Sequence, residues 1–186
     1  MHILSKWVIY TCCCILLSSC EFNCSIGKKS DDPKDTKTVT NSVTEKNGTI
    51  ITNNISLSSK GFKIKKATLL LPDDTRVSDD NVVELNQKIK LAIFIDEGWK
   101  LKNGKIFPGA SEKMSTDDGV TVLNAEDLFA DNTTSGFNAE DGKEISLTAY
   151  VSKENTGVKY YMVNFRVWDK NSDAEITGHY KFYIKH

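Results

Sequence analysis

Most of this sequence lacks cysteine. The chain has 186 residues, and all five of its cysteines lie at or before position 24. The 162 residues beyond that position can form no internal disulfide, no cysteine-ligated zinc site and no cysteine nucleophile. A fold built from them must be stabilised by its hydrophobic core.

Histidines are also few, and the net charge is small. The chain has three histidines, and 24 basic against 25 acidic side chains give a net charge of −1. A protein with so small a net charge has no strong positive electrostatic field, so we expect no nucleic-acid partner. His179 and His186 stand at the two ends of one predicted strand, about 23 Å apart at roughly 3.3 Å per residue, so they cannot share a metal ion.

Catalytic and metal-binding motifs are missing as well. There is no Gly-x-Ser-x-Gly and no glycine-rich phosphate loop. Asp169, Asn171 and Asp173 have the spacing that opens a calcium loop, but Ala174 and Tyr180 replace the glycine and the acid that such a loop requires. A polar turn between two strands explains these residues better. We therefore expect no metal, no cofactor and no enzymatic activity.

One apolar run, from Trp7 to Leu17, is too short to span a bilayer comfortably. It has 11 residues, and a spanning helix needs about 20. Lys6 precedes the run, and the small residues Ser18 and Ser19 follow it. A charged start, a short apolar middle and small residues are typical of a signal peptide that is cleaved.

The sequence Leu17-Ser18-Ser19-Cys20 resembles the lipobox of bacterial lipoproteins. The resemblance implies that residues 1–19 are removed, and that Cys20 receives a diacylglyceryl group on its thiol and an acyl chain on its new amino terminus. Two or more chains anchor a protein stably. The expected location is the cell envelope, at the outer membrane, facing either the periplasm or the surface. An ordinary secretory peptide or an uncleaved anchor is the alternative interpretation of residues 1–19.

Residues 20–47 are predicted to form a flexible tether. Apolar residues are sparse and aperiodic after Cys20, so the segment cannot bury enough surface to order itself. A coil of this length measures roughly 30 Å from end to end. Cys24, within it, is either an idle thiol or the site of an intermolecular disulfide.

Residues 48–186 are predicted to form one β-sandwich domain. Apolar and polar residues alternate over four segments, at 89–95, 145–151, 161–167 and 180–184, and less clearly over Thr49–Leu57, Phe62–Leu71 and Val120–Asn124. Alternation with period two indicates strands that bury one face. Strands at this spacing favour an all-β fold, a two-sheet antiparallel sandwich that is immunoglobulin-like or similar.

One short helix is expected near 125–130, and no other. Asn124 suits the N-cap, and Glu126 and Asp127 suit the first turn. Leu128 and Phe129 would then close one end of the sandwich.

Three aromatic residues are candidate ligand-binding residues: Trp99, Tyr160 and Trp168. Tryptophan and tyrosine combine a large contact area with a polar group, which suits recognition of sugars or proteins. Burial within the fold is the alternative explanation. The acidic turn residues could also meet in one loop cluster; they are Asp73, Asp74, Asp79, Asp80, Asp117 and Asp118.

Three functions fit these features. The first is a non-enzymatic, membrane-anchored lipoprotein whose sandwich binds a protein or glycan partner. The second is a structural lipoprotein of an envelope secretion complex, because a small anchored sandwich is similar to the lipoproteins of type VI secretion. The third is a hydrolase that uses an acidic pair, although no motif marks one.

Overall fold

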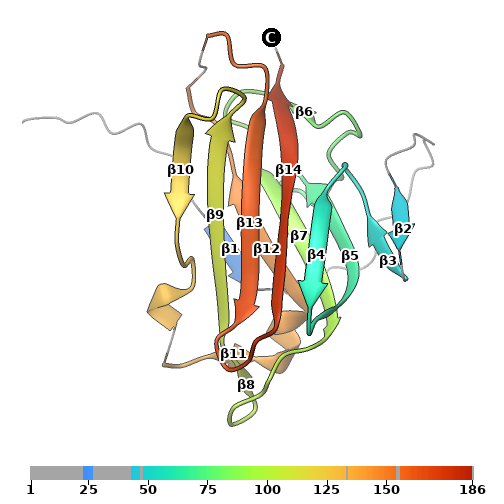
Figure 1. Ribbon diagram of the computed structural model, residues 1–186, viewed down its shortest axis with the longest axis vertical. Helices are drawn as coiled ribbons and strands as arrows, with labels where there is room; N and C mark the ends of the chain where they lie inside the picture. The colour runs from blue at the N-terminus through green and yellow to red at the C-terminus, as the bar shows by residue number, and fades with distance from the viewer. Residues whose placement is uncertain (1–22, 27–42, 47, 133, 154–155, 186) are drawn as a thin grey trace, which may run out of the picture.

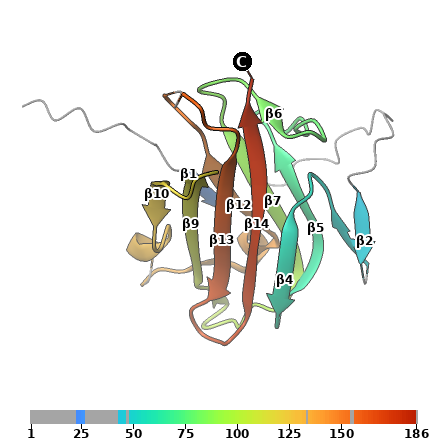
Figure 2. The ribbon, with the colours of Figure 1, turned by 45° about the horizontal axis from the view of Figure 1, so that its top comes forward.

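The chain folds into two β-sheets packed face to face (Figures 1 and 2). The computed structural model describes residues 23–26, 43–46, 48–132, 134–153 and 156–185. The predicted all-β sandwich is confirmed, and all but two of the described strand pairs are antiparallel. The exceptions are the short pairs β3·β5 and β6·β14.

The first sheet has six strands. In spatial order they are β1 (Asn23–Ile26), β12 (Glu144–Ala149), β7 (Ile89–Glu97), β5 (Lys63–Leu70), β3 (Thr49–Ile51) and β2 (Thr44–Lys46).

The second sheet has five strands on its main path. They are β10 (Thr121–Ala125), β9 (Pro108–Thr116), β13 (Tyr161–Asp169), β14 (Glu175–Ile184) and β4 (Ser56–Lys60). The short β6 (Val82–Val83) pairs with the end of β14, and β8 (Lys105–Ile106) pairs with β11 (Phe137–Asn138).

Alternate residues of both sheets form the core. Leu91 and Ile93 of β7 face the interior, as do Val163 and Val167 of β13, and all four are fully buried. The period-two pattern therefore predicted not only these strands but also the face that each one buries.

The sandwich has two distinct ends. We call one the upper end, which holds the 84–87 turn, the β9–β10 turn and the last residues of β14 (Figure 1). Asn86 donates its backbone N–H to the carbonyl of Val151 there, over 2.9 Å. The opposite, lower end holds β8, β11 and the turn between β13 and β14 (Figure 1).

The helix predicted near 125–130 is wrong. Asn124 and Ala125 belong to β10, where they pair with Lys113 and Glu112 of β9. The hydrogen bonds of the sheet form in place of a helix N-cap at Asn124. Only a 3-10 turn, η1 (Ala130–Asn132), follows. Leu128 and Phe129 nevertheless pack against the core as expected. A second 3-10 turn, η2 (Ala139–Lys143), was not predicted.

Two strand predictions also needed correction. Thr49–Leu57 is not one strand, because Asn53 and Asn54 adopt left-handed φ angles of 58° and 51° and divide it into β3 and β4. The nine residues of β9 were missed, since Pro108, Gly109 and Glu112 give that segment no clear alternation of apolar residues.

The segment predicted as a tether contains two strands. Asn23–Ile26 forms β1 against β12, and Thr44–Lys46 forms β2 against β3. The structure differs from the expected tether at these residues, and the domain includes β2, ahead of the predicted boundary at 48. The rest of that segment, with Cys20 and residues 1–19, lies outside the described residues.

Candidate functional site

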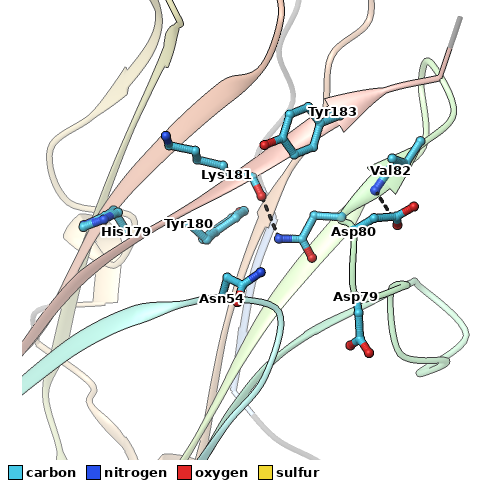
Figure 3. A pocket seen from close by; sticks show the side chains of 9 residues that line it. Asn54, Asp79, Asp80, Val82, His179, Tyr180, Lys181 and Tyr183 are labelled. Carbon is cyan, nitrogen blue, oxygen red and sulfur yellow. Dashed lines mark hydrogen bonds between the residues drawn. The ribbon is translucent and has the colours of Figure 1, made fainter. Parts of the chain in front are cut away.

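An open hollow of about 570 Å³ lies along the edge of β14, near the upper end (Figure 3). It forms because β4 pairs with β14 only as far as His179, while β6 begins to pair at Tyr183. The β14 residues between these two pairings have β13 on one edge and no strand on the other. Asn81 bridges part of this gap by donating its side-chain amide to the carbonyl of Lys181, over 2.8 Å.

Polar groups line one side of this β14 hollow. Asp79 and Asp80 come from the turn before β6, and Asn54 comes from the turn before β4. The Ser78 hydroxyl and the Val82 amide both donate to the Asp80 carboxylate, and these bonds lower the pKa of that group below its ordinary value. Asp79 pairs with Arg76 at 2.7 Å. The hollow therefore offers carboxylate and amide groups as hydrogen-bond partners.

Aromatic side chains stand beside these polar groups. Tyr183 lines the hollow and is 37% exposed. Tyr160 packs edge-on against it, with ring centroids 6.2 Å apart, and the Lys181 ammonium lies 4.3 Å from the Tyr160 ring centroid. A phenol ring held in this way can pack against a sugar ring or an apolar side chain. Tyr160 is thus the one predicted binding residue near the hollow.

Trp99 packs within the fold at the lower end. Its ring lies edge-on to Phe62, with centroids 4.7 Å apart, and its indole N–H donates to the carbonyl of Gly142 over 2.9 Å. These contacts join the chain after β7 to η2. The contacts described for Trp99 are structural, and its role in binding stays a prediction.

Trp168 lies flat on the outer face of β13. Its ring covers Gly109 of β9, where an added Cβ would lie only 2.1 Å from the indole. The Arg166 guanidinium lies over the Trp168 ring, 4.9 Å from the ring centroid. Seven residues of β13, 161–167, separate it from Tyr160, so the structure does not bring Trp168 and Tyr160 into one platform.

The acidic turn residues do not form a metal cluster. Asp169 is buried and accepts hydrogen bonds from Lys100 N, Asn171 N and Ser172 Oγ, which accounts for the polar turn after β13. Asp117 accepts from Lys159 N, and Asp74 pairs with Lys90 of β7. Among the described residues, no group of three or more histidine, cysteine or acidic side chains could hold a metal ion.

Glu112 was missed by sequence reasoning, and Tyr180 was predicted only as an apolar position of the strand at 180–184. Both are buried in the core, with 1% and 0% exposure, and neither side chain has a hydrogen-bond partner among the described residues. Burial raises the pKa of Glu112 to about 8. Burial, and then the Glu112 carboxylate, raise the pKa of Tyr180. Assigning β9 as a strand would have revealed Glu112, because it alternates with the inward-facing Ala110 and Met114.

No helix in the described part of the chain is long and apolar enough to cross a membrane. The predicted lipidation site, Cys20, lies outside that part, as does His186.

Comparison with known proteins finds only distant structural similarity. No family model and no curated protein matches the chain. One solved structure to which it is similar is the C-terminal domain of wzt. The identity is 11% and the TM-score 0.45, over 72% of this chain and 79% of the other. So distant a similarity carries no functional argument.

Proposed function

We propose that this protein is a non-enzymatic lipoprotein of the bacterial cell envelope that binds a protein or glycan partner. Residues 1–19 act as its signal peptide, and lipid on Cys20 anchors it to the outer membrane. The sequence Leu17-Ser18-Ser19-Cys20 supports the anchor. The β14 hollow is the proposed binding site.

The observation that carries the binding role is the composition of the β14 hollow. It combines the partly exposed Tyr183 with the oxygen atoms of Asp79 and Asp80 and with His179 and Lys181. Hydroxyl groups of a glycan, or polar groups of a protein, can bond to these side chains while an apolar face packs on the phenol.

Crosslinking in intact cells, followed by recovery from detergent-solubilised membranes and mass spectrometry, tests this function. The wild-type protein should recover one stoichiometric partner, either a protein or a glycan-bearing molecule. Tyr183→Ala with Lys181→Ala should lose that partner. Thr177→Ala is the matched control, because Thr177 is an exposed residue of the same strand and does not line the hollow.

Two results would overturn the proposal. Equal recovery of the partner by the double variant and by Thr177→Ala would remove the hollow as the binding site. Hydrolysis of glycans or esters by the purified protein would remove the non-enzymatic role and favour the hydrolase alternative.

A further inference from the structure

The first described strand lies very close in sequence to the predicted lipid anchor. Asn23 begins β1, three residues after Cys20, and it pairs with Thr148, next to the last residue of β12. Because β1 is antiparallel to β12, its start faces the upper end of the sandwich (Figure 1).

This pairing shortens the reach of the anchor. Three residues span at most about 10 Å, at 3.3–3.6 Å each. Without β1, the chain from Cys20 to β2 at Thr44 would span roughly 80 Å when fully extended. A lipid on Cys20 therefore lies within about 10 Å of the start of β1, at the upper half of the domain.

The upper end near β1 has a surface that suits lipid headgroups. Val120, in the β9–β10 turn, is 58% exposed, and β10 and β1 lie on the same side of the sandwich (Figures 1 and 2). Lys88, Lys153 and Lys159 are exposed at this end. The acids at this end are engaged: Glu84 pairs with Lys185 at 2.7 Å, Asp117 accepts from Lys159 N, and Asp118 accepts from Val120 N. At the β14 hollow, Asp79 pairs with Arg76 and Asp80 accepts from the Ser78 hydroxyl.

We propose that β1 is a positioning strand that holds the upper end of the sandwich against the membrane surface. The contact surface is the β9–β10 turn with the 84–88 and 151–153 segments, and its partner is the headgroup layer of a lipid bilayer. This proposal rests on the proposed lipid anchor. The domain would then have a fixed orientation at the membrane, whereas a domain on a flexible tether would rotate freely.

Fluorescence quenching in vesicles tests the orientation. The acylated mature protein, residues 20–186, is placed in vesicles of phosphatidylethanolamine and phosphatidylglycerol that contain spin-labelled lipid. Cys24 is replaced in every variant, by alanine unless stated otherwise, and a fluorophore is attached at Val120→Cys or at Lys102→Cys. These two turns lie beyond opposite ends of β9, a separation of about 30 Å along nine residues. Quenching is expected at Val120→Cys and not at Lys102→Cys.

A second pair of variants tests the role of β1. Cys24→Pro with Ser25→Pro removes two consecutive backbone N–H groups, one of which faces β12 whichever the register. Cys24→Ala with Ser25→Ala keeps both. The proline pair should abolish the difference between the two fluorophore positions, and the alanine pair should preserve it.

The possible results separate the orientation from the anchor. Equal quenching at both positions, in protein that does bind the vesicles, overturns the positioning role of β1, as does an unchanged difference in the proline pair. Protein that fails to bind the vesicles at all overturns the lipid anchor itself, and with it the orientation.

Discussion

Glu112 stands out among single residues because a carboxyl group is buried in the core without a hydrogen-bond partner among the described residues. Desolvation disfavours its charged form, so the group stays protonated in the folded state up to a pKa of about 8. The Tyr180 hydroxyl is a second polar group in the same core that has no hydrogen-bond partner among the described residues. Such a pair costs stability, which the apolar residues of both sheets must offset.

We predict that stability falls as the pH rises from about 4.5 to about 8, the ordinary and folded pKa values of Glu112. Below that window Glu112 is protonated in both states. Within it, only the unfolded chain releases the proton, so ionisation favours unfolding. The full loss is on the order of 5 kcal/mol, at 1.36 kcal/mol per unit. Urea unfolding across this pH range measures it.

Glu112→Gln is the control for this pH dependence, because it keeps the shape and removes the titration. Its stability should change much less over the same range, and Glu112→Leu should be more stable than the wild type near pH 8. An identical pH slope in the wild type and Glu112→Gln would falsify the assignment. Asp73 and Asp80 have lowered pKa values, so they act with the opposite sign, and only in acid.

At the scale of elements, the turn between β3 and β4 joins parts of the chain that are distant in sequence. The buried Asn53 side chain donates to Val77 O at 3.0 Å and to Ser78 O at 3.1 Å. It also accepts from Leu69 N of β5 at 3.3 Å. One amide thus fixes β5 and the segment before β6 relative to the turn.

We predict that Asn53→Ala destabilises the protein by about 3 kcal/mol or more beyond Asn54→Ala, because it leaves buried backbone groups without partners. Asn54 is a matched control, since its φ is also left-handed at 51° but its side chain is exposed. Alanine therefore strains the backbone similarly at both positions. Chemical unfolding compares the two variants, and equal losses of stability would contradict the role given to the Asn53 amide.

Sequence periodicity predicted those elements whose stability comes from burying one face. It located β7 and β13 because Leu91, Ile93 and Val163 alternate with polar residues. It missed β9, where glycine and a buried acid interrupt the pattern, and it misplaced a helix at Asn124 because a capping residue can also pair in a sheet. The β14 hollow could not be predicted, since it depends on where β4 stops pairing and β6 starts.

At the scale of the whole molecule, the proposed orientation at the membrane limits which partners can reach the proposed binding site. The β14 hollow lies near the upper end, lined by Val82 and Tyr183, where β6 pairs with β14. The proposed orientation places this same end toward the bilayer. A partner bound in the hollow would then lie close to the membrane surface, as another anchored protein or a membrane-attached glycan does. A diffusing partner would have to approach along the membrane plane.

The anchor is the feature on which this arrangement depends, and we predict that Cys20→Ser abolishes acyl labelling. Serine has no thiol to receive the diacylglyceryl group, so the protein should leave the membrane fraction or stay unprocessed. Cys24→Ser is the matched control and should keep both labelling and membrane partition, because Cys24 lies outside the lipobox resemblance. Metabolic labelling with a fatty-acid analogue and membrane fractionation measure both effects. Labelling and partition that persist in Cys20→Ser would contradict Cys20 as the lipid anchor, and β1 would then lose its role as a positioning strand.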